Sequence, residues 1–481
     1  MDVPTDLTNF GGNIRFQPRQ VFAPENEGEV LRNLGEVRGR RIRVIGRMHS
    51  WSEAATGEDV VLDLRRLNSV SVEVGADGPV ATVGAGCQIK RLLSELERLG
   101  NWTMPSLGLI TEQAIAGAIS TGTHGSGKHS LSHYMEEVRV ATYDRSTGQP
   151  VIVTFKDGAE LRAARCSLGC LGVIVSVKFR CRSQYRVEEC VRECASVDEA
   201  LAAEASFPLQ QFFLIPWCWK VMAQQRRETE APRSLTVTLY RIYWFLSIDL
   251  GLHLLITLLV QVLRLNRTVR FFFRRLFSRL VVRGWRVVDK SSAMLIMEHE
   301  LFRHIEIELF VKRSRLPAAL VLVRDVIECF GRRGHELSRE HREALARAGM
   351  LERVIAGAGT YTHHYPICVR SVLPDDTLIS MASSDDESYY AISLISYAKP
   401  HARAGYFEFA GVLAHSMAEL FDARPHWGKV CPVDAQTVAR LYPHLPEFQR
   451  ICQQWDSAGV FRNRWVDGIL FPSPTRPSGD Q

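Results

Sequence analysis

The sequence of 481 residues predicts an α+β fold, and three patterns lead to that prediction. Residues 1–100 alternate short apolar runs, which are typical of strands, with amphipathic runs, which are typical of helices. Residues 105–127 are almost all small and predict a segment whose backbone lies close to a ligand. Residues 298–311 include an alternation of apolar and acidic side chains, which has the period of a strand.

The composition is that of an ordinary globular protein. Apolar residues make up 46% of the chain, and the formal net charge of +6 is mild for its length. The eleven cysteines are irregularly spaced and lack the partners of a zinc site, so we expect reduced thiols, no metal and a cytoplasmic location. The N-terminus has neither the basic nor the apolar region of a signal peptide. Residues 471–481 predict a disordered tail.

The first hundred residues contain five readable elements. A helical pattern begins at Glu27, and the apolar run 42–45 predicts a strand. Two more strands are predicted from Val60 and from Val80, with turn residues between them. Residues 89–99 predict an amphipathic helix with its leucines on one face.

The first predicted strand ends in the turn from Gly46 to Ser50. Gly46 permits a tight turn or a close approach of the backbone to a ligand. Successive backbone N–H groups in such a turn form a concavity that binds anions. His49 would lie beside that concavity as a nucleophile and proton carrier. Alone, one glycine and then a histidine after a strand is typical of a structural turn.

The small-residue run 105–127 is a second candidate binding segment. Its glycines, alanines, serines and threonines would let the backbone contact a large flat or extended ligand. The run lacks the lysine of a Walker loop and the spacing of a GxGxxG fingerprint. Residues 114–119 are apolar and should be buried, which disfavours a surface loop. A second glycine turn, at residues 168–172, leads into another predicted strand.

These three pieces, in this order, resemble the FAD-binding domain of the vanillyl-alcohol-oxidase (PCMH) type. They are a G-x-x-H-S turn at 46–50, an A-G-A-I-S-T-G-T-H-G run at 116–125 and an L-G-x-x-G-V strand at 168–173. The resemblance extends over residues 10–183 and implies FAD as the cofactor.

The resemblance also implies roles for individual positions. The first turn would hold the pyrophosphate and ribityl chain, the small-residue run the flavin and adenosine, and the third piece the adenine. His49 matches the position at which sugar-lactone and alditol oxidases link the flavin covalently through its 8α-methyl group. The residues assigned to FAD in this way are Ile45, Gly46, Arg47, Met48, His49, Ser50, Trp51, Ser106, Thr111, Ala116, Gly117, Ser120, Gly122, Thr123, Gly125, Gly172, Val173 and Ile174.

An apolar and then basic segment occupies residues 242–286. Residues 242–263 are long enough and apolar enough to span a bilayer, but every fourth residue from Asp249 to Gln261 is polar. Eight arginines and no acidic residue follow up to Arg286. The pattern fits a helix packed on a cap domain, a helix lying on a membrane surface, or a spanning helix. We expect anionic headgroups rather than nucleic acid as the partner of the basic run.

Glu306 and Glu308 share one face of the strand predicted within residues 298–311. This face is either solvated or, by resemblance to an E-M-E-Y-type strand, part of the substrate domain. Helices are predicted at 316–330 and 338–348.

Residues 366–376 resemble the substrate-site strand of aldonolactone and alditol oxidases, which reads P-I-E-V-R followed by A-D-D. Arg370 matches the family arginine, but Cys368 occupies the position of the glutamate. A thiol is neutral at pH 7 unless it is activated, so it cannot replace a carboxylate. Either Glu306 or Glu308 supplies the acid, or the substrate differs, or the activity is reduced.

The run H-W-G-K at 426–429 resembles the sugar-lactone oxidase branch of the same family. The resemblance implies that Lys429 lies at the flavin pyrimidine edge and stabilises the anionic reduced ring. The alternative is a helix C-cap with a glycine in a left-handed turn.

Together the resemblances imply a bipartite FAD domain with an inserted cap. Residues 10–183 and 421–470 would hold the flavin, and 184–420 would form the substrate domain. The implied reaction is two-electron oxidation of a hydroxyl-bearing carbon in a sugar lactone or polyol, with the hydride passing to flavin N5. Arg370 would hold the substrate oxygen, and Glu306 is the candidate base. Oxygen or another acceptor would then take the electrons.

Two other functions remain compatible with the sequence. One is a flavin-binding protein at a membrane surface, in which Cys368 marks a lost substrate site. The other is an FAD dehydrogenase that uses residues 242–286 to reach an electron acceptor in the membrane.

Overall fold

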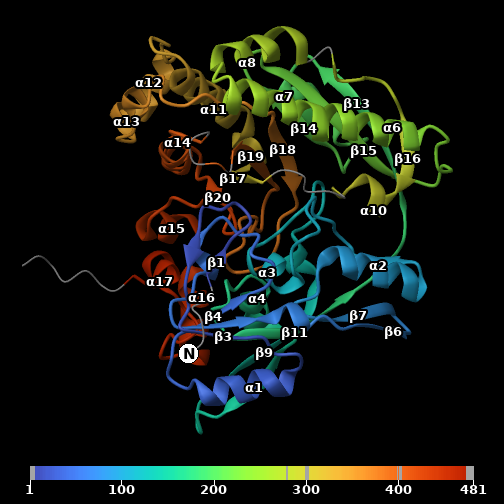
Figure 1. Cartoon of the computed structure of the whole chain (residues 1–481), viewed down its shortest axis with the longest axis vertical. Helices are drawn as coiled ribbons and strands as arrows, with labels where there is room; N and C mark the ends of the chain where they lie inside the picture. The colour runs from blue at the N-terminus through green and yellow to red at the C-terminus, as the bar shows by residue number, and fades with distance from the viewer. Residues whose placement is uncertain (1–5, 278–279, 298–302, 398, 400–402, 473–481) are drawn as a thin grey trace, which may run out of the picture.

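The computed structural model describes residues 6–277, 280–297, 303–397, 399 and 403–472. Two lobes lie one above the other (Figure 1), with β13 to β20 in the upper lobe and the earlier and later elements in the lower lobe. Separate helices and mostly antiparallel sheets confirm the α+β prediction. The expected tail falls outside the described residues from 473 onwards.

The lower lobe begins with a small parallel sheet, in the order β3-β5-β4. Its strands are Gln20–Phe22, Val60–Asp63 and Ile42–Ile45. Helix α1, Glu27–Glu36, makes the parallel connection from β3 to β4, and Asn26 caps it by accepting from the Glu29 amide. The sheet directs the carboxyl end of β4 toward the cavity described below.

A five-stranded antiparallel sheet, in the order β10-β9-β11-β7-β6, forms the other part of this lobe. Its strands are β6 Val70–Gly75, β7 Gly78–Gly84, β9 Met135–Tyr143, β10 Pro150–Phe155 and β11 Val173–Arg180. The accompanying helices are α2 Ile89–Gly100, α3 Ile115–Ser120 and α4 Gly158–Arg165. The Ile115 amide donates to Cys87 O, which anchors α3 and its small residues inside the lobe.

The chain returns to the lower lobe at its C-terminal end. Helices α15 Ala435–Leu441, α16 Leu445–Trp455 and α17 Arg464–Leu470 form this part. The Ile42 amide donates to Val460 O, and the buried Arg43 donates to Phe461 O at 2.5 Å. The first strands and the last helices therefore fold as one unit.

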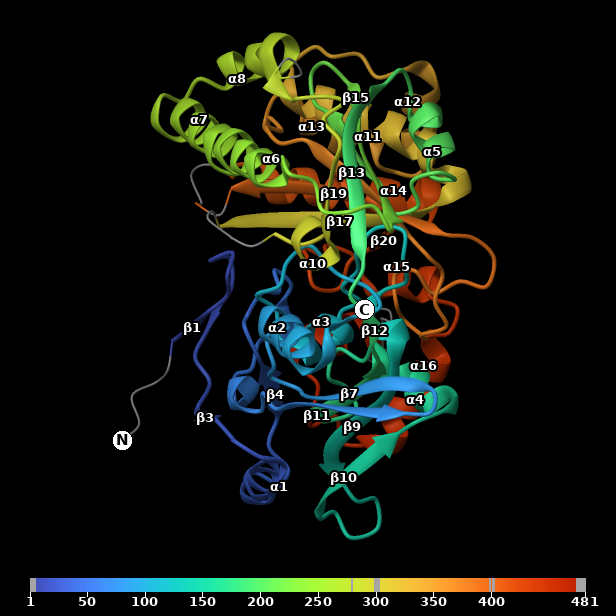
Figure 2. The same ribbon diagram turned by 90° about the vertical axis from the view of Figure 1, so that its right-hand side faces the viewer.

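The upper lobe is built on one antiparallel sheet of eight strands, in the order β16-β13-β15-β14-β18-β19-β17-β20. Its strands are β13 Arg186–Cys194, β14 Gln211–Ile215, β15 Lys220–Thr229, β16 Val287–Lys290, β17 His304–Lys312, β18 Ile367–Val372, β19 Tyr389–Tyr397 and β20 Arg424–Pro425. The sheet separates α6 to α8 from α11 and α12 (Figure 2). The helices beside it, apart from those of the apolar segment, are α5 Val197–Ala203, α10 Ser291–Met294, α11 Leu316–Gly331, α12 Arg339–Arg347, α13 Leu351–Ala356 and α14 Tyr406–Phe421.

Short elements complete the described chain. They are two ribbons, β1 Leu7–Thr8 with β2 Arg15–Phe16 and β8 Trp102–Thr103 with β12 Arg182–Ser183, and single turns of 3₁₀ helix at Glu53–Ala55, Leu64–Arg66, Leu131–Tyr134 and Arg313–Arg315.

The apolar segment forms a long helix with α-helical and π-helical stretches. They are α6 Val237–Trp244, η4 Phe245–Leu252, α7 His253–Thr257 and η5 Leu258–Val262, followed by α8 Asn266–Phe272 and η6 Phe273–Phe277. Among the described residues, Val237–Val260 is the one helix long and apolar enough to cross a membrane, judged by length and composition alone.

Candidate active site

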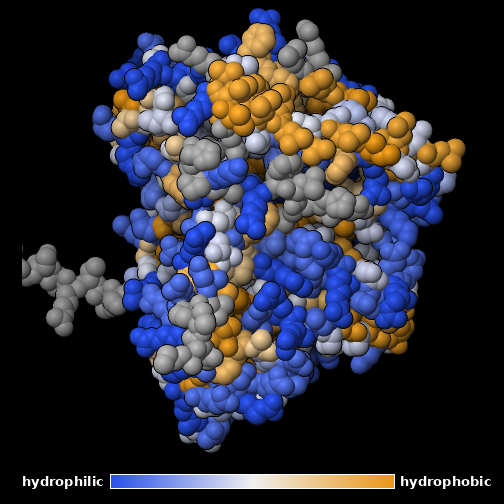
Figure 3. Space-filling model, viewed as in Figure 1, coloured by the Kyte–Doolittle hydropathy of each residue, from blue (hydrophilic) through white to orange (hydrophobic). Residues whose placement is uncertain are grey.

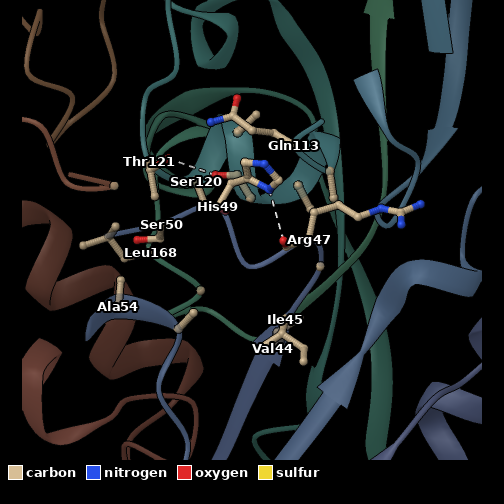
Figure 4. A pocket seen from close by; sticks show the side chains of 18 of the residues that line it. Val44, Ile45, Arg47, His49, Ser50, Ala54, Gln113, Ser120, Thr121 and Leu168 are labelled. Atoms are coloured by element: carbon tan, nitrogen blue, oxygen red, sulfur yellow. Dashed lines mark hydrogen bonds between the residues drawn. The ribbon is translucent and has the colours of Figure 1, made fainter. Parts of the chain in front are cut away.

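A cavity opens where the turn after β4 meets α3, the glycine turn before β11 and the segment around Gly428. Figure 4 shows His49 next to Ser120 in the middle of the view, with Gln113 above, Arg47 to the right, and Thr121, Ser50 and Leu168 to the left. Twelve of the eighteen residues assigned to FAD line this cavity: Ile45, Gly46, Arg47, Met48, His49, Ser50, Trp51, Ala116, Gly117, Ser120, Gly172 and Ile174. Three sequence motifs far apart in the chain therefore line one cavity.

The other six assigned residues lie outside the lining of the cavity. They are Ser106, Thr111, Gly122, Thr123, Gly125 and Val173. Ser106 Oγ donates to His129 O, and Thr111 O accepts from the Lys90 amide, so these two residues support neighbouring loops.

Several lining residues were not assigned from the sequence. They include Gln113, Ala114, Thr121, Leu168, Gly169, Gly428 and Phe461. All but Phe461 lie within or next to a motif that was singled out, so extending each motif by a residue or two would have found them. Phe461 begins a Phe-Arg-Asn-Arg turn at 461–464 that follows the H-W-G-K run in the sequence, but no role in binding was assigned to it.

The turn after β4 is shaped by close packing. A Cβ atom on Gly46 would lie 2.7 Å from Ala114 Cβ, so a side chain there would displace α3. Met48 has a φ of 57°, a left-handed conformation that is uncommon for a residue with a side chain. The Phe10 amide donates to Met48 O at 2.8 Å and fixes this conformation. The turn therefore presents its backbone to the cavity.

His49 is half-buried at the cavity wall. Its ring stacks on Phe10, with the centroids 4.8 Å apart. Nδ1 lies 3.1 Å from Arg47 O, which accepts the bond when the proton is on Nδ1. In the neutral ring the lone pair is then on Nε2. Two contacts therefore hold the imidazole in one orientation at the cavity.

The cavity suits a large, flat cofactor with a phosphate chain. Its wall is mostly backbone and small side chains, and a Cβ on Gly117 would meet nothing within 4 Å, so its surface is open to a ligand. Lys429 and Arg47 bring positive charge to the lining. These features match the flat rings and the negative charge of FAD.

Residues 426–429 close the cavity from the upper lobe. The Trp51 amide donates to Gly428 O at 2.8 Å, and Ser52 Oγ donates to Trp427 O at 2.6 Å. Lys429 Nζ lies 4.3 Å from the centroid of the Trp51 ring. This segment follows β20 rather than a helix, so the C-cap interpretation is wrong.

Glu306 and Glu308 are both buried, so the interpretation of their strand as having a solvated face is wrong. They are 5% and 2% exposed. Glu306 accepts from Ser393 Oγ and pairs with Lys429 Nζ. Glu308 has different neighbours. Its Oε1 lies 3.6 Å from Arg370 Nη1 and makes no hydrogen bond among the described residues.

Positive and imidazole groups surround the Glu308 carboxylate. His124 Nε2 lies 3.5 Å from its Oε1. Burial opposes ionisation, but His124, followed by Lys429, outweighs it and holds the pKa of Glu308 below its usual range. Burial lowers the pKa of His426 to about 3, so this imidazole is neutral, and its Nδ1 accepts from the Gly428 amide.

Ligand atoms of His124, Glu308 and His426 lie within 4.8 Å of one another, a spacing that a metal ion could bridge. Arg370 and the nearby Lys429 place positive charge beside the same carboxylate. Because these charges repel a cation, the cluster is better suited to a substrate oxygen that gains negative charge.

Cys368 and Arg370 project from β18 two residues apart, next to Gln211 of β14. Gln211 Oε1 accepts from Arg370 Nε at 2.9 Å and from Cys368 Sγ at 3.7 Å. Burial raises the pKa of Cys368 to about 11, so its thiol carries no charge at neutral pH. In the sheet register, Ser393 of β19 pairs with Cys368 on one side and with Glu308 on the other. The three side chains form one row across neighbouring strands.

Comparison with known proteins identifies the family. Residues 18–147 match the model of the FAD binding domain, and residues 174–469 match that of D-arabinono-1,4-lactone oxidase. A "Long-chain alcohol oxidase" from an uncultured marine euryarchaeote is 53% identical over 462 residues, which is 96% of both chains. L-Gulonolactone oxidase of Mus musculus is 24% identical, over 96% of this chain and 98% of that one.

The fold has solved counterparts. The crystal structure of cholesterol oxidase from B. sterolicum superposes with a TM-score of 0.72 at 15% identity and covers 97% of each chain. With the match to the FAD-domain model, this confirms the predicted PCMH-type fold and FAD as the cofactor. The chain belongs to the D-arabinono-1,4-lactone oxidase family and is an FAD-dependent oxidoreductase that acts on CH–OH groups.

Proposed function

We propose that this enzyme oxidises the hydroxyl-bearing carbon of a sugar lactone or polyol. Bound FAD supplies a two-electron acceptor, and the described residues prepare the hydroxyl group. The observation that carries the proposal is the buried contact between Glu308 and Arg370, 3.6 Å apart, beside cavity-lining His426 and Lys429.

We assign the acidic role to Glu308 rather than to Glu306. Lys429 and Ser393 already engage both oxygens of Glu306. Glu308 Oε1 has no hydrogen bond within the described part of the chain and is ionised at neutral pH. It can accept the hydrogen of the substrate hydroxyl while Arg370 donates to the oxygen. A positioned acid–base pair of this kind commonly contributes about 10²- to 10⁴-fold in rate.

Lys429 acts through charge at the cofactor cavity. Lys429 lines the cavity, and its Nζ contacts the carboxylate of Glu306 and the face of the Trp51 ring. A cation fixed there favours electron-rich states of a bound flavin. We therefore propose that Lys429 tunes the reduction potential of the flavin.

A long-chain alcohol is the second candidate substrate. The relative that is 53% identical bears the name long-chain alcohol oxidase. Cys368 also favours this candidate, because a neutral thiol beside Gln211 is a weaker partner for a second sugar hydroxyl than a carboxylate is. A substrate with a single hydroxyl group needs only Glu308 and Arg370.

Three finer assignments accompany this function. We infer covalent attachment of FAD through His49, supported by the fixed ring at the cavity wall. We infer oxygen as the electron acceptor, with an acceptor in a membrane as the alternative. We place the enzyme in the cytoplasm, with access to a membrane surface.

The deciding experiment is anaerobic bleaching of the purified yellow holoprotein. Its flavin absorbance is followed after addition of sugar lactones, alditols and long-chain primary alcohols. Bleaching by lactones or alditols supports the first candidate, and bleaching by long-chain alcohols alone supports the second. A protein that binds FAD but bleaches with none of them contradicts both. Flavin that stays with acid-precipitated wild type and not with His49→Ala supports the covalent bond.

A further inference from the structure

The exposed apolar side chains of this protein are concentrated in one region. Among the described residues, seventeen large apolar side chains are exposed, and twelve of them lie between residues 235 and 282. These are Leu235, Leu239, Ile242, Leu246, Leu254, Leu258, Val262, Leu263, Leu265, Phe271, Leu280 and Val282. Figure 3 shows apolar surface gathered in a band over α6, α7 and α8 at the top of the molecule. We call the surface of these twelve residues the apolar face.

The opposite side of the long helix is packed on the cap. Leu252, Ile256 and Val260, spaced four residues apart, are buried. The ring of His253 lies 5.3 Å from that of Tyr365, and burial lowers the pKa of His253 to about 4. The helix is therefore held by the protein along one side and exposes apolar residues along the other.

Basic residues lie among and just beyond the later residues of the apolar face. Arg264, Arg274 and Arg275 are exposed after the long helix. Arg283 and Arg286 are exposed beyond Val282, where they pair with glutamates of β13. No acidic residue occurs in the sequence from 250 to 288. A surface with this charge attracts anions and repels another copy of itself.

We propose that the apolar face seats this enzyme on an anionic lipid bilayer. The apolar side chains enter the boundary between headgroups and acyl chains, and the arginines contact the anionic headgroups. The long helix lies in the plane of the surface. A spanning orientation would separate His253 from Tyr365 and carry Asp249 into hydrocarbon, which is costly for a carboxylate. This partner is independent of the substrate, so the proposal stands or falls separately from the proposed reaction.

Cosedimentation of the full-length holoprotein with vesicles tests the proposal. One vesicle population is phosphatidylcholine alone, and the other contains a one-third share of phosphatidylglycerol. We expect at least about tenfold stronger partition into the anionic vesicles at low salt, because each basic residue near such a surface adds attraction. High salt should reduce the difference between the two populations. Equal and negligible binding to both would overturn the proposal.

Paired substitutions locate the contact. The double variant Leu254→Glu, Leu258→Glu should lower binding at least tenfold, because both residues are about half exposed on the apolar face. Val321→Glu is the matched control, since Val321 is 53% exposed on α11, on the other side of the sheet in Figure 2. Arg274→Gln with Arg275→Gln should weaken only the binding to anionic vesicles, and Arg339→Gln should leave it unchanged. Equal effects in the variants and their controls would contradict the assignment.

Two further results would assign the face differently. Retention of the protein in membranes after carbonate extraction would indicate a spanning helix. A dimer in solution that Leu254→Glu, Leu258→Glu dissociates, without vesicle binding by the wild type, would assign the face to a second copy. The flavin absorbance of each variant establishes that it is folded.

Discussion

Glu308 Oε1 lies 3.6 Å from Arg370 Nη1, although the two residues belong to strands separated by β19. The resemblance of residues 366–376 implies an acid and an arginine on one strand, two residues apart. Here Cys368 takes the place of that acid, and the carboxylate approaches from β17. An acid therefore lies beside Arg370 here as well, but it belongs to a different strand.

Glu308→Gln should reduce kcat by roughly two to four orders of magnitude, which is the usual contribution of a positioned acid–base group. The amide keeps the shape of the side chain but cannot take the hydroxyl proton. KM should change far less than kcat. Steady-state kinetics with whichever substrate bleaches the flavin provides the measurement, and retained flavin absorbance establishes folding.

Glu306→Gln is the matched comparison for that variant. Its oxygens contact Lys429 and Ser393 rather than Arg370, so its main effect should be on the reduction potential of the flavin. A larger loss of kcat in Glu306→Gln than in Glu308→Gln would reverse the assignment of the two glutamates.

Cys368→Glu should shift the substrate preference toward polyhydroxylated compounds. A carboxylate at this position would lie beside Gln211 and two residues from Arg370, where it could accept from a second substrate hydroxyl. The measurement is the ratio of kcat/KM for an alditol to that for a long-chain alcohol, which we expect to rise at least about tenfold, the value of a charge-assisted hydrogen bond. Cys368→Ser should leave the ratio nearly unchanged, and a rise of equal size in both variants would contradict the role of charge.

The cofactor half of the site could be predicted from the sequence, because its residues lie within local motifs. Gly46 and His49 are three positions apart, and Gly117 and Ser120 share one short helix. The substrate half could not be resolved in the same way. Glu306 and Glu308 face the same side of β17, and contacts with residues distant in sequence, such as Lys429 and Arg370, distinguish them. The sequence likewise could not show where the helix with polar residues from Asp249 onwards packs, because its position depends on a tertiary contact between His253 and Tyr365.

Gly117→Ala should weaken FAD binding without destabilising the apoprotein. A Cβ at this position meets no atom within 4 Å beyond its chain neighbours and the backbone of its own helix, and Gly117 lies in helix α3, where alanine is favoured over glycine by about 1 kcal/mol. The methyl group would instead enter the cavity. The measurement pairs flavin content after purification with the thermal unfolding of apoprotein. An apoprotein that unfolds at lower temperature than the wild type would show that the methyl group disturbs the protein itself.

The stability of the protein should fall in mild acid because several buried histidines stay neutral. Burial lowers the pKa values of His363, His364 and His426 to about 3. In the unfolded chain an ordinary histidine takes up its proton near pH 6.5. Between about pH 6.5 and 3 the unfolded state therefore binds more protons, and the free energy of unfolding decreases as the pH falls.

Each such histidine should remove about 1.4 kcal/mol of stability for every pH unit below about 6.5. His364→Phe isolates one of them, because its ring packs near Tyr397 and its Nε2 has no hydrogen-bond partner among the described residues. Urea unfolding at pH 7 and pH 5 measures the effect. The stability of the variant relative to the wild type should rise by about 2 kcal/mol on going to pH 5. A relative stability that is the same at both pH values would show that His364 takes up its proton equally in the folded and unfolded states.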